Sequence, residues 1–167
     1  YLMILPKYQR SLKHYQYFSS DHFSNLKEDV VKQLFNFHRN HCIHNDINEN
    51  NIVKLKKDDE NHWKIIDFSK MVLMTHTEDE ELMIHTESGQ TKLVPHYIKE
   101  TSNKDIFWTF MKDWKAFVSI LSNFFEETND DIMEFKESYK NKDKIKMIKV
   151  MEKIGSQFDQ RIPEIYY

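Results

Sequence analysis

Two short apolar segments that lie close together constrain the fold of this chain more than any other feature. Residues 51–55 (NIVKL) and 62–67 (HWKIID) have the length of β-strands, and the polar stretch 56–61 (KKDDEN) between them is typical of a turn. The sequence therefore predicts a β-hairpin here. Because a hairpin returns the chain to its starting point, side chains before its first strand and after its second are expected to meet.

The residues at the two ends of this hairpin have the chemistry of a phosphoryl-transfer site. The stretch 44–51 (HNDINENN) leads into the first strand, and Asp67-Phe68 ends the second. The carboxylate of Asp67 and the carboxamide oxygen of Asn51 are hard ligands that suit Mg²⁺. A second carboxylate, Asp46, can orient a hydroxyl and accept its proton. Asp and Asn also form ordinary turns, but the strands and the Asp-Phe pair that follow favour the site.

Outside the hairpin, apolar periodicity predicts mainly helices. Leu26, Val30, Leu34 and Phe37 recur every three or four residues, which places them on one helical face. Asp21, just before them, suits the N-cap position. The expected elements are a buried strand over 1–5, helices over 11–20, 22–41 and 113–125, a charged helical pattern over 130–155, and weak periodicity over 68–109. We therefore expect one α+β domain, mostly α, spanning 1–167.

Composition excludes several classes of protein. The chain has 24 basic and 27 acidic residues, so there is no basic excess to indicate nucleic acid as a partner. No apolar run approaches the roughly 20 residues of a membrane span. The lone cysteine, Cys42, rules out an internal disulfide and fits a reducing, intracellular and most simply cytoplasmic setting. The nine histidines are scattered and form no metal-ligand spacing with Cys42.

Taken in order, several segments resemble the large lobe of the protein-kinase superfamily. HNDINENN resembles the catalytic loop H-R-D-L-x-x-x-N, and IDFSKM resembles the metal-binding D-F-G element. Four further segments resemble the fifth strand with the hinge, the end of the activation segment, the central helix and the final segment: 1–12, 93–100, 112–125 and 159–165. The resemblance covers almost the whole chain and implies a kinase-like C-lobe with a small β-hairpin at the active site.

The resemblance also implies a role for individual residues. Asp46 matches the catalytic base, and Asn48 stands where protein Ser/Thr kinases usually place a lysine near the transferred phosphate. Asn51 and Asp67 match the Mg²⁺ ligands. The hinge and adenine positions fall on Ile4, Leu5, Lys7 and Val53. Supporting roles fall on His44 and Phe68 as a packed pair, on Asp113 as a ligand of the loop backbone, and on Glu100 and Arg161 as an ion pair.

Some positions depart from the family pattern. Asn45 replaces the arginine that answers a phosphate on the activation loop, and Asn48 removes a cation that would stabilise the transition state. Ser69 replaces the glycine of D-F-G and restricts the backbone there. The sequence contains no Gly-rich loop and no strand lysine of the small lobe. We therefore expect a large lobe that is a fragment of a longer protein.

Three functions follow from these observations. The first is an ATP- and Mg²⁺-dependent phosphotransferase that acts on a Ser or Thr hydroxyl of a protein. The second is a small-molecule kinase of the choline or aminoglycoside type, which the triplet His-Asn-Asp at 44–46 and the missing lysine at position 48 favour. The third is a catalytically silent lobe that docks onto another kinase or its substrate as a decoy. We favour the first.

Overall fold

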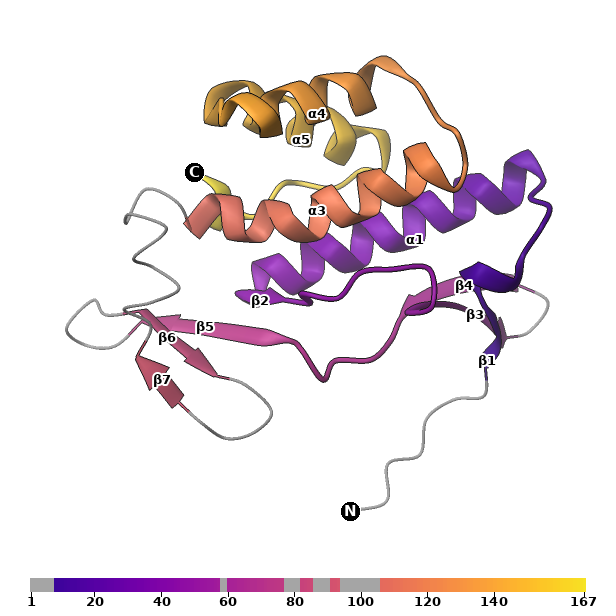
Figure 1. Cartoon of the computed structure of the whole chain (residues 1–167), viewed down its shortest axis with the longest axis horizontal. Helices are drawn as coiled ribbons and strands as arrows, with labels where there is room; N and C mark the ends of the chain where they lie inside the picture. The colour runs from indigo at the N-terminus through magenta and orange to yellow at the C-terminus, as the bar shows by residue number, and fades with distance from the viewer. Residues whose placement is uncertain (1–7, 58–59, 77–81, 86–90, 94–105) are drawn as a thin grey trace.

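The computed structural model describes residues 8–57, 60–76, 82–85, 91–93 and 106–167. Over these residues the protein is α+β and mostly helical, with the helices stacked on one side and the strands running along the other (Figure 1). The described α-helices are α1 (Ser20–Arg39), α3 (Ile106–Asn123), α4 (Asp130–Asn141) and α5 (Lys144–Gln157). None of these described helices has the length and apolar character needed to cross a membrane.

The strands form two small antiparallel sheets. One sheet has the order β1-β3-β4, and the other has the order β2-β5-β6-β7. Their bounds are β1 (Tyr8–Ser11), β2 (Cys42–Ile43), β3 (Ile52–Lys57), β4 (Glu60–Ile65), β5 (Val72–His76), β6 (Leu82–His85) and β7 (Thr91–Leu93). β3 and β4 are the predicted hairpin, with Ile52 opposite Ile65. The hairpin prediction is therefore confirmed, with a shorter connection than the six-residue turn expected.

Helix α1 covers the edge of the hairpin sheet. β4 is an edge strand, and an uncovered edge would leave its backbone groups open to pairing with another chain. Asp29 accepts a hydrogen bond from the Trp63 amide at 2.8 Å. Gln33 donates to the Trp63 carbonyl at 2.9 Å and accepts from the Ile65 amide at 3.0 Å. Because Asp29 and Gln33 are four residues apart on α1, they lie on one helical face and provide hydrogen-bond partners for the free backbone groups of Trp63 and Ile65.

Helix α1 agrees with the prediction for 22–41 except at its start. Its N-cap is Ser19, whose side chain accepts a hydrogen bond from the His22 amide at 3.2 Å, so the expected cap at Asp21 is wrong. Asp21 instead lies in the first turn, where its charge favours the helix dipole. Leu26, Val30 and Leu34 are fully buried, as their spacing predicted.

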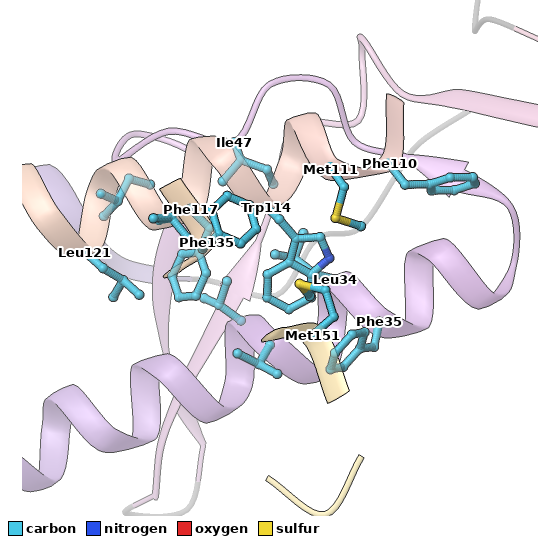
Figure 2. Close-up of a cluster of buried hydrophobic side chains, with 14 of the residues drawn as sticks. Leu34, Phe35, Ile47, Phe110, Met111, Trp114, Phe117, Leu121, Phe135 and Met151 are labelled. Carbon is cyan, nitrogen blue, oxygen red and sulfur yellow. The ribbon is translucent and has the colours of Figure 1, made fainter. Parts of the chain in front are cut away.

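Helix α3 is the centre of the hydrophobic core. It lies between α1 and the pair formed by α4 and α5 (Figure 1), and ten of its residues are buried. Figure 2 shows side chains of α1, α3, α4 and α5 gathered around Trp114. The helix begins at residue 106, so the predicted start at 113 is wrong, and Asp113 lies inside the helix.

The helical pattern over 130–155 contains two helices rather than one. Lys142 adopts a left-handed φ of 53°, and Asp143 then caps α5 by accepting a hydrogen bond from the Lys146 amide at 3.0 Å. The break lets α4 and α5 fold back against each other. Their buried side chains, which include Phe135 and Met151, then join the core around α3 (Figure 2).

Two other predictions fail or lie outside the described residues. The helix predicted over 11–20 is wrong, because only a 3-10 turn forms at Leu12–His14 and the chain just before it pairs with β3. The weakly periodic stretch 68–109 contributes strands β5, β6 and β7, which the sequence did not predict. The strand predicted over 1–5 lies outside the described residues.

Candidate functional site

The loop 44–51 joins β2 to β3 and gathers polar side chains around Asp46. The side-chain nitrogen Nδ2 of Asn51 donates to the backbone carbonyl of Asp46 at 2.9 Å and to the Asp46 carboxylate oxygen Oδ2 at 3.3 Å. The side-chain nitrogen Nδ2 of Asn48 donates to the backbone carbonyl of Asp46 at 3.1 Å and to Asp46 Oδ1 at 3.3 Å. Ile47, which lies between Asp46 and Asn48 in the sequence, is buried in the hydrophobic core (Figure 2). It anchors the loop while the polar side chains stay together.

Asp113 holds the start of this loop from inside the protein. Its two carboxylate oxygens accept hydrogen bonds from consecutive backbone amides: His44 at 2.8 Å and Asn45 at 2.9 Å. Asp113 is only 2% exposed, so these charge-assisted bonds are shielded from water. Asn45 has a left-handed φ of 64°, a conformation that Asn tolerates better than most residues. These two hydrogen bonds, called the Asp113 clamp below, thus stabilise the bend of the chain at Asn45.

His44 connects the loop to the far end of the hairpin. Its side chain is fully buried, and its Nε2 lies 3.0 Å from the Ile66 carbonyl. Its ring meets the ring of Phe68 edge to face, with 5.4 Å between centroids, and lies parallel to Phe37 at 6.2 Å. The packed pair of His44 and Phe68 expected from the sequence is therefore present.

Asp67 stands at the exit of the hairpin, next to Asn51. The Ile66 amide donates to the Asn51 carbonyl at 2.8 Å, which brings the two ends of the hairpin together. Asp67 has a left-handed φ of 64°, and its Oδ1 accepts from the Ser69 hydroxyl at 2.6 Å and the Ser69 amide at 3.3 Å. These bonds lower the pKa of the Asp67 carboxyl, with smaller contributions from His44 and Lys70. The two hydrogen bonds from Ser69 thus orient this carboxylate.

Lys70 completes the cluster, and the sequence reasoning missed it. Its ammonium nitrogen lies 3.0 Å from Asp46 Oδ2, although the two residues are far apart along the chain. The signal available in the sequence was a lysine directly after the Asp67-Phe68-Ser69 element, beside a loop that lacks its expected cation at Asn48. The pairing itself depends on the hairpin, which brings position 70 back to the loop.

A second buried network lies beneath the clamp and was also missed. His38 of α1 contacts Asp113 Oδ2 through Nε2 at 3.2 Å, and its Nδ1 contacts the Tyr166 hydroxyl. The Trp114 indole donates to the same hydroxyl at 2.7 Å. Burial lowers the pKa of His38, although its hydrogen bond to Asp113 opposes this shift. A neutral His38 that donates from Nε2 and accepts at Nδ1 satisfies every one of these contacts.

Other predicted site residues are less informative. Val53 is fully buried in β3, but it does not belong to the main hydrophobic cluster that contains Ile52. Arg161 is exposed, and its carbonyl accepts a hydrogen bond from the Arg39 guanidinium at 2.6 Å. Glu100, Ile4, Leu5 and Lys7 lie outside the described residues. The nucleotide contacts and the ion pair between Glu100 and Arg161 therefore stay predictions.

The residues at the hairpin ends fit a magnesium ion bound together with a phosphate group. Both hydrogen bonds from Asn51 to Asp46 use its amide nitrogen, so the carbonyl oxygen Oδ1 is the atom not engaged by Asp46. Asp67 is exposed, and the hydrogen bonds from Ser69 lower the pKa of its carboxyl. Mg²⁺ often takes only one or two protein oxygens and completes its shell with water and phosphate. Within the described residues there is no cluster of three or more His, Cys, Asp or Glu side chains that could hold a metal by themselves.

Comparisons with known proteins add no assignment. Models of protein families, curated protein sequences and solved structures were searched, and none of the three searches found a match.

Proposed function

We propose that this chain carries the catalytic part of a protein-kinase-like phosphotransferase that uses ATP and Mg²⁺. The observation that carries the proposal is the group formed by Asp46, Asn51 and Asp67 at the two ends of one hairpin. Asn51 touches Asp46 at 2.9 and 3.3 Å, and a backbone hydrogen bond of 2.8 Å joins Asn51 to the residue before Asp67. Such a group offers a base and two oxygen ligands at the adjoining ends of one hairpin, and these are parts that phosphoryl transfer uses.

Each residue has a distinct part in this proposal. Asp46 orients the acceptor hydroxyl and takes its proton, while Asn48 and Asn51 hold the carboxylate in place through their amide groups. Asn51 Oδ1 and the Asp67 carboxylate are the oxygens that would hold Mg²⁺. When bound, Mg²⁺ neutralises charge on the phosphates. Asp113 contributes indirectly, because it holds the backbone on which Asp46 sits.

The acceptor is proposed to be a Ser or Thr hydroxyl of a protein. The segment 93–100, whose resemblance to the end of an activation segment favours a protein acceptor, lies mostly outside the described residues. The neutral Asn48 is the observation that favours the alternative, a small hydroxylated acceptor such as choline or an aminoglycoside. The two acceptor classes are separated by experiment.

The test is transfer of the γ-phosphoryl group from labelled ATP, with Mg²⁺, to a panel of proteins, choline and aminoglycosides. The purified chain is compared with Asp46→Asn, and with Asp143→Asn as a matched control at a partly exposed helix cap far from the loop in sequence. Loss of a general base should lower the rate by roughly 10²- to 10⁴-fold in Asp46→Asn, and the control should match the parent. Full activity of Asp46→Asn would refute the proposal, and absence of transfer together with absence of Mg·ATP binding by the parent chain would leave the silent-lobe hypothesis.

A further inference from the structure

The carboxylate of Asp46 is surrounded by two neutral amides and one cation. Asn48 donates to Oδ1, while Asn51 and the ammonium group of Lys70 both approach Oδ2, at 3.3 and 3.0 Å. Within the described parts of the chain, Lys70 is the one lysine or arginine in an ion pair with Asp46. Positive charge therefore reaches this site from the segment after the hairpin, and not from the loop that carries Asp46.

A tight turn presents Lys70 to the site. The Met71 amide donates to the Phe68 carbonyl at 3.0 Å, so Ser69 and Lys70 occupy the corner of the turn. Ser69 is tied to Asp67 through its hydroxyl and its amide. The backbone of Lys70 is thus fixed next to the candidate metal ligand, while its side chain is 60% exposed and can change its partner. The Asp46 side chain is 27% exposed, so this ion pair is still open to water, and such pairs add little stability.

We infer that Lys70 is the phosphate-binding cation of this site, an inference that rests on the proposed phosphotransferase function. In a phosphoryl-transfer transition state, negative charge spreads over the equatorial oxygens of the transferred group, and a nearby cation stabilises it. Asn48 is neutral and cannot supply this charge. Lys70 leaves Asp46 when the triphosphate binds and contacts its terminal phosphoryl group. The same movement leaves Asp46 Oδ2 available to the acceptor hydroxyl.

The step balances without any further reactant. The acceptor oxygen forms a bond to the γ-phosphorus, and the bond from this phosphorus to the β–γ bridging oxygen breaks. The bridging oxygen keeps the electron pair and leaves as part of ADP, while the proton of the acceptor goes to Asp46. Lys70 forms and breaks no covalent bond, and its charge stabilises the oxygens of the group in transfer.

The test uses three variants of the full chain: Lys70→Met, Lys70→Met with Asn48→Lys, and the control Lys146→Met. Lys146 is also 60% exposed and also paired with a carboxylate, that of Glu137 at 3.9 Å. Transfer rates are measured at saturating ATP, and calorimetry gives the affinities for Mg·ATP and Mg·ADP. Circular dichroism checks that each variant is folded.

We expect Lys70→Met to lower the transfer rate roughly 10²-fold and to weaken Mg·ATP binding roughly tenfold, with Mg·ADP binding unchanged. A lysine at position 48 should restore at least a tenth of the lost rate, because it places charge at the same phosphoryl group. A purely structural role of Lys70 would not be rescued in this way. The control should behave as the parent chain does.

Three results would overturn the inference. The first is a Lys70→Met variant with the transfer rate and the Mg·ATP and Mg·ADP affinities of the parent chain, while Asp46→Asn is inactive. This result would reject the role of Lys70 and keep the proposed function. A faster rate in Lys70→Met would show that the ion pair restrains Asp46 instead of serving the phosphate. Failure of the parent chain to bind either nucleotide would reject both the inference and the function on which it rests.

Discussion

Replacement of Asp113 by Asn tests whether the buried clamp holds the loop that carries Asp46. The side chain keeps its shape in this variant but loses its charge. In the parent chain, its two oxygens accept from the backbone amides of His44 and Asn45 at 2.8 and 2.9 Å, and Oδ2 also lies 3.2 Å from His38 Nε2. An amide group has only one oxygen, so in either orientation one buried backbone N–H must face an NH₂ group.

The cost follows from these contacts. A buried donor left without an acceptor costs about 1–3 kcal/mol, and loss of charge on the remaining bond costs about 1 kcal/mol more. Removal of a buried charge recovers part of this, because the carboxylate no longer has to be desolvated. We expect a net loss of about 2 kcal/mol in the free energy of unfolding, or a fall of roughly 4–8 °C in Tm for a domain of this size.

The assay is urea unfolding followed by tryptophan fluorescence. The control is Asp143→Asn, where the same chemical change occurs at a partly exposed N-cap and Asn caps about as well as Asp. The control should stay within about 0.5 kcal/mol of the parent. The reasoning is refuted if Asp113→Asn is as stable as the control, because the clamp would then contribute nothing that an amide cannot replace.

Two further predictions concern stability. Gly155→Ala should destabilise the protein by about 1–3 kcal/mol, because a Cβ atom at Gly155 would lie 2.5 Å from the backbone oxygen of Gln160. The urea midpoint of this variant is compared with that of Ser156→Ala, a substitution at the exposed neighbouring position. Equal midpoints would contradict the prediction. Burial lowers the pKa of His38 below its ordinary value of 6.5, so the unfolded chain takes up this proton first and stability should fall as the pH drops below about 6.5. His38→Gln should reduce the difference in unfolding free energy between pH 7.5 and 5.5, and an unchanged difference would show that other histidines cause it.

Local patterns accounted for much of the fold. The alternation of short apolar runs and a polar turn predicted β3 and β4, since a hairpin depends on residues that are close in the sequence. The spacing of Leu26, Val30 and Leu34 predicted the buried face of α1, because helical periodicity is also local. Short elements were harder: β1 and the sheet formed by β2 and β5–β7 gave no clear pattern, since strands of two to five residues owe their existence to their partners.

The candidate site divides in a similar way. The identity of Asp46, Asn51 and Asp67 as the chemical groups of interest came from residue types at the ends of one hairpin. The contacts between Asp113 and the loop, and between His44 and Phe68, were expected from the resemblance to protein kinases and are present in the structure. The nucleotide-binding residues and the pairing of Glu100 with Arg161 stay predictions, as does the kinase function.

The amino-acid sequence by itself determined the hairpin, the main helical faces and the polar groups at the hairpin ends, because each depends on residues that are neighbours along the chain. Only the tertiary structure decided that Lys70 pairs with Asp46, and that His38 bridges Asp113 and Tyr166 beneath the loop. These contacts join residues that are 24 to 128 positions apart in the sequence. Long-range pairs of this kind arise from the packing of whole elements, which no local pattern encodes.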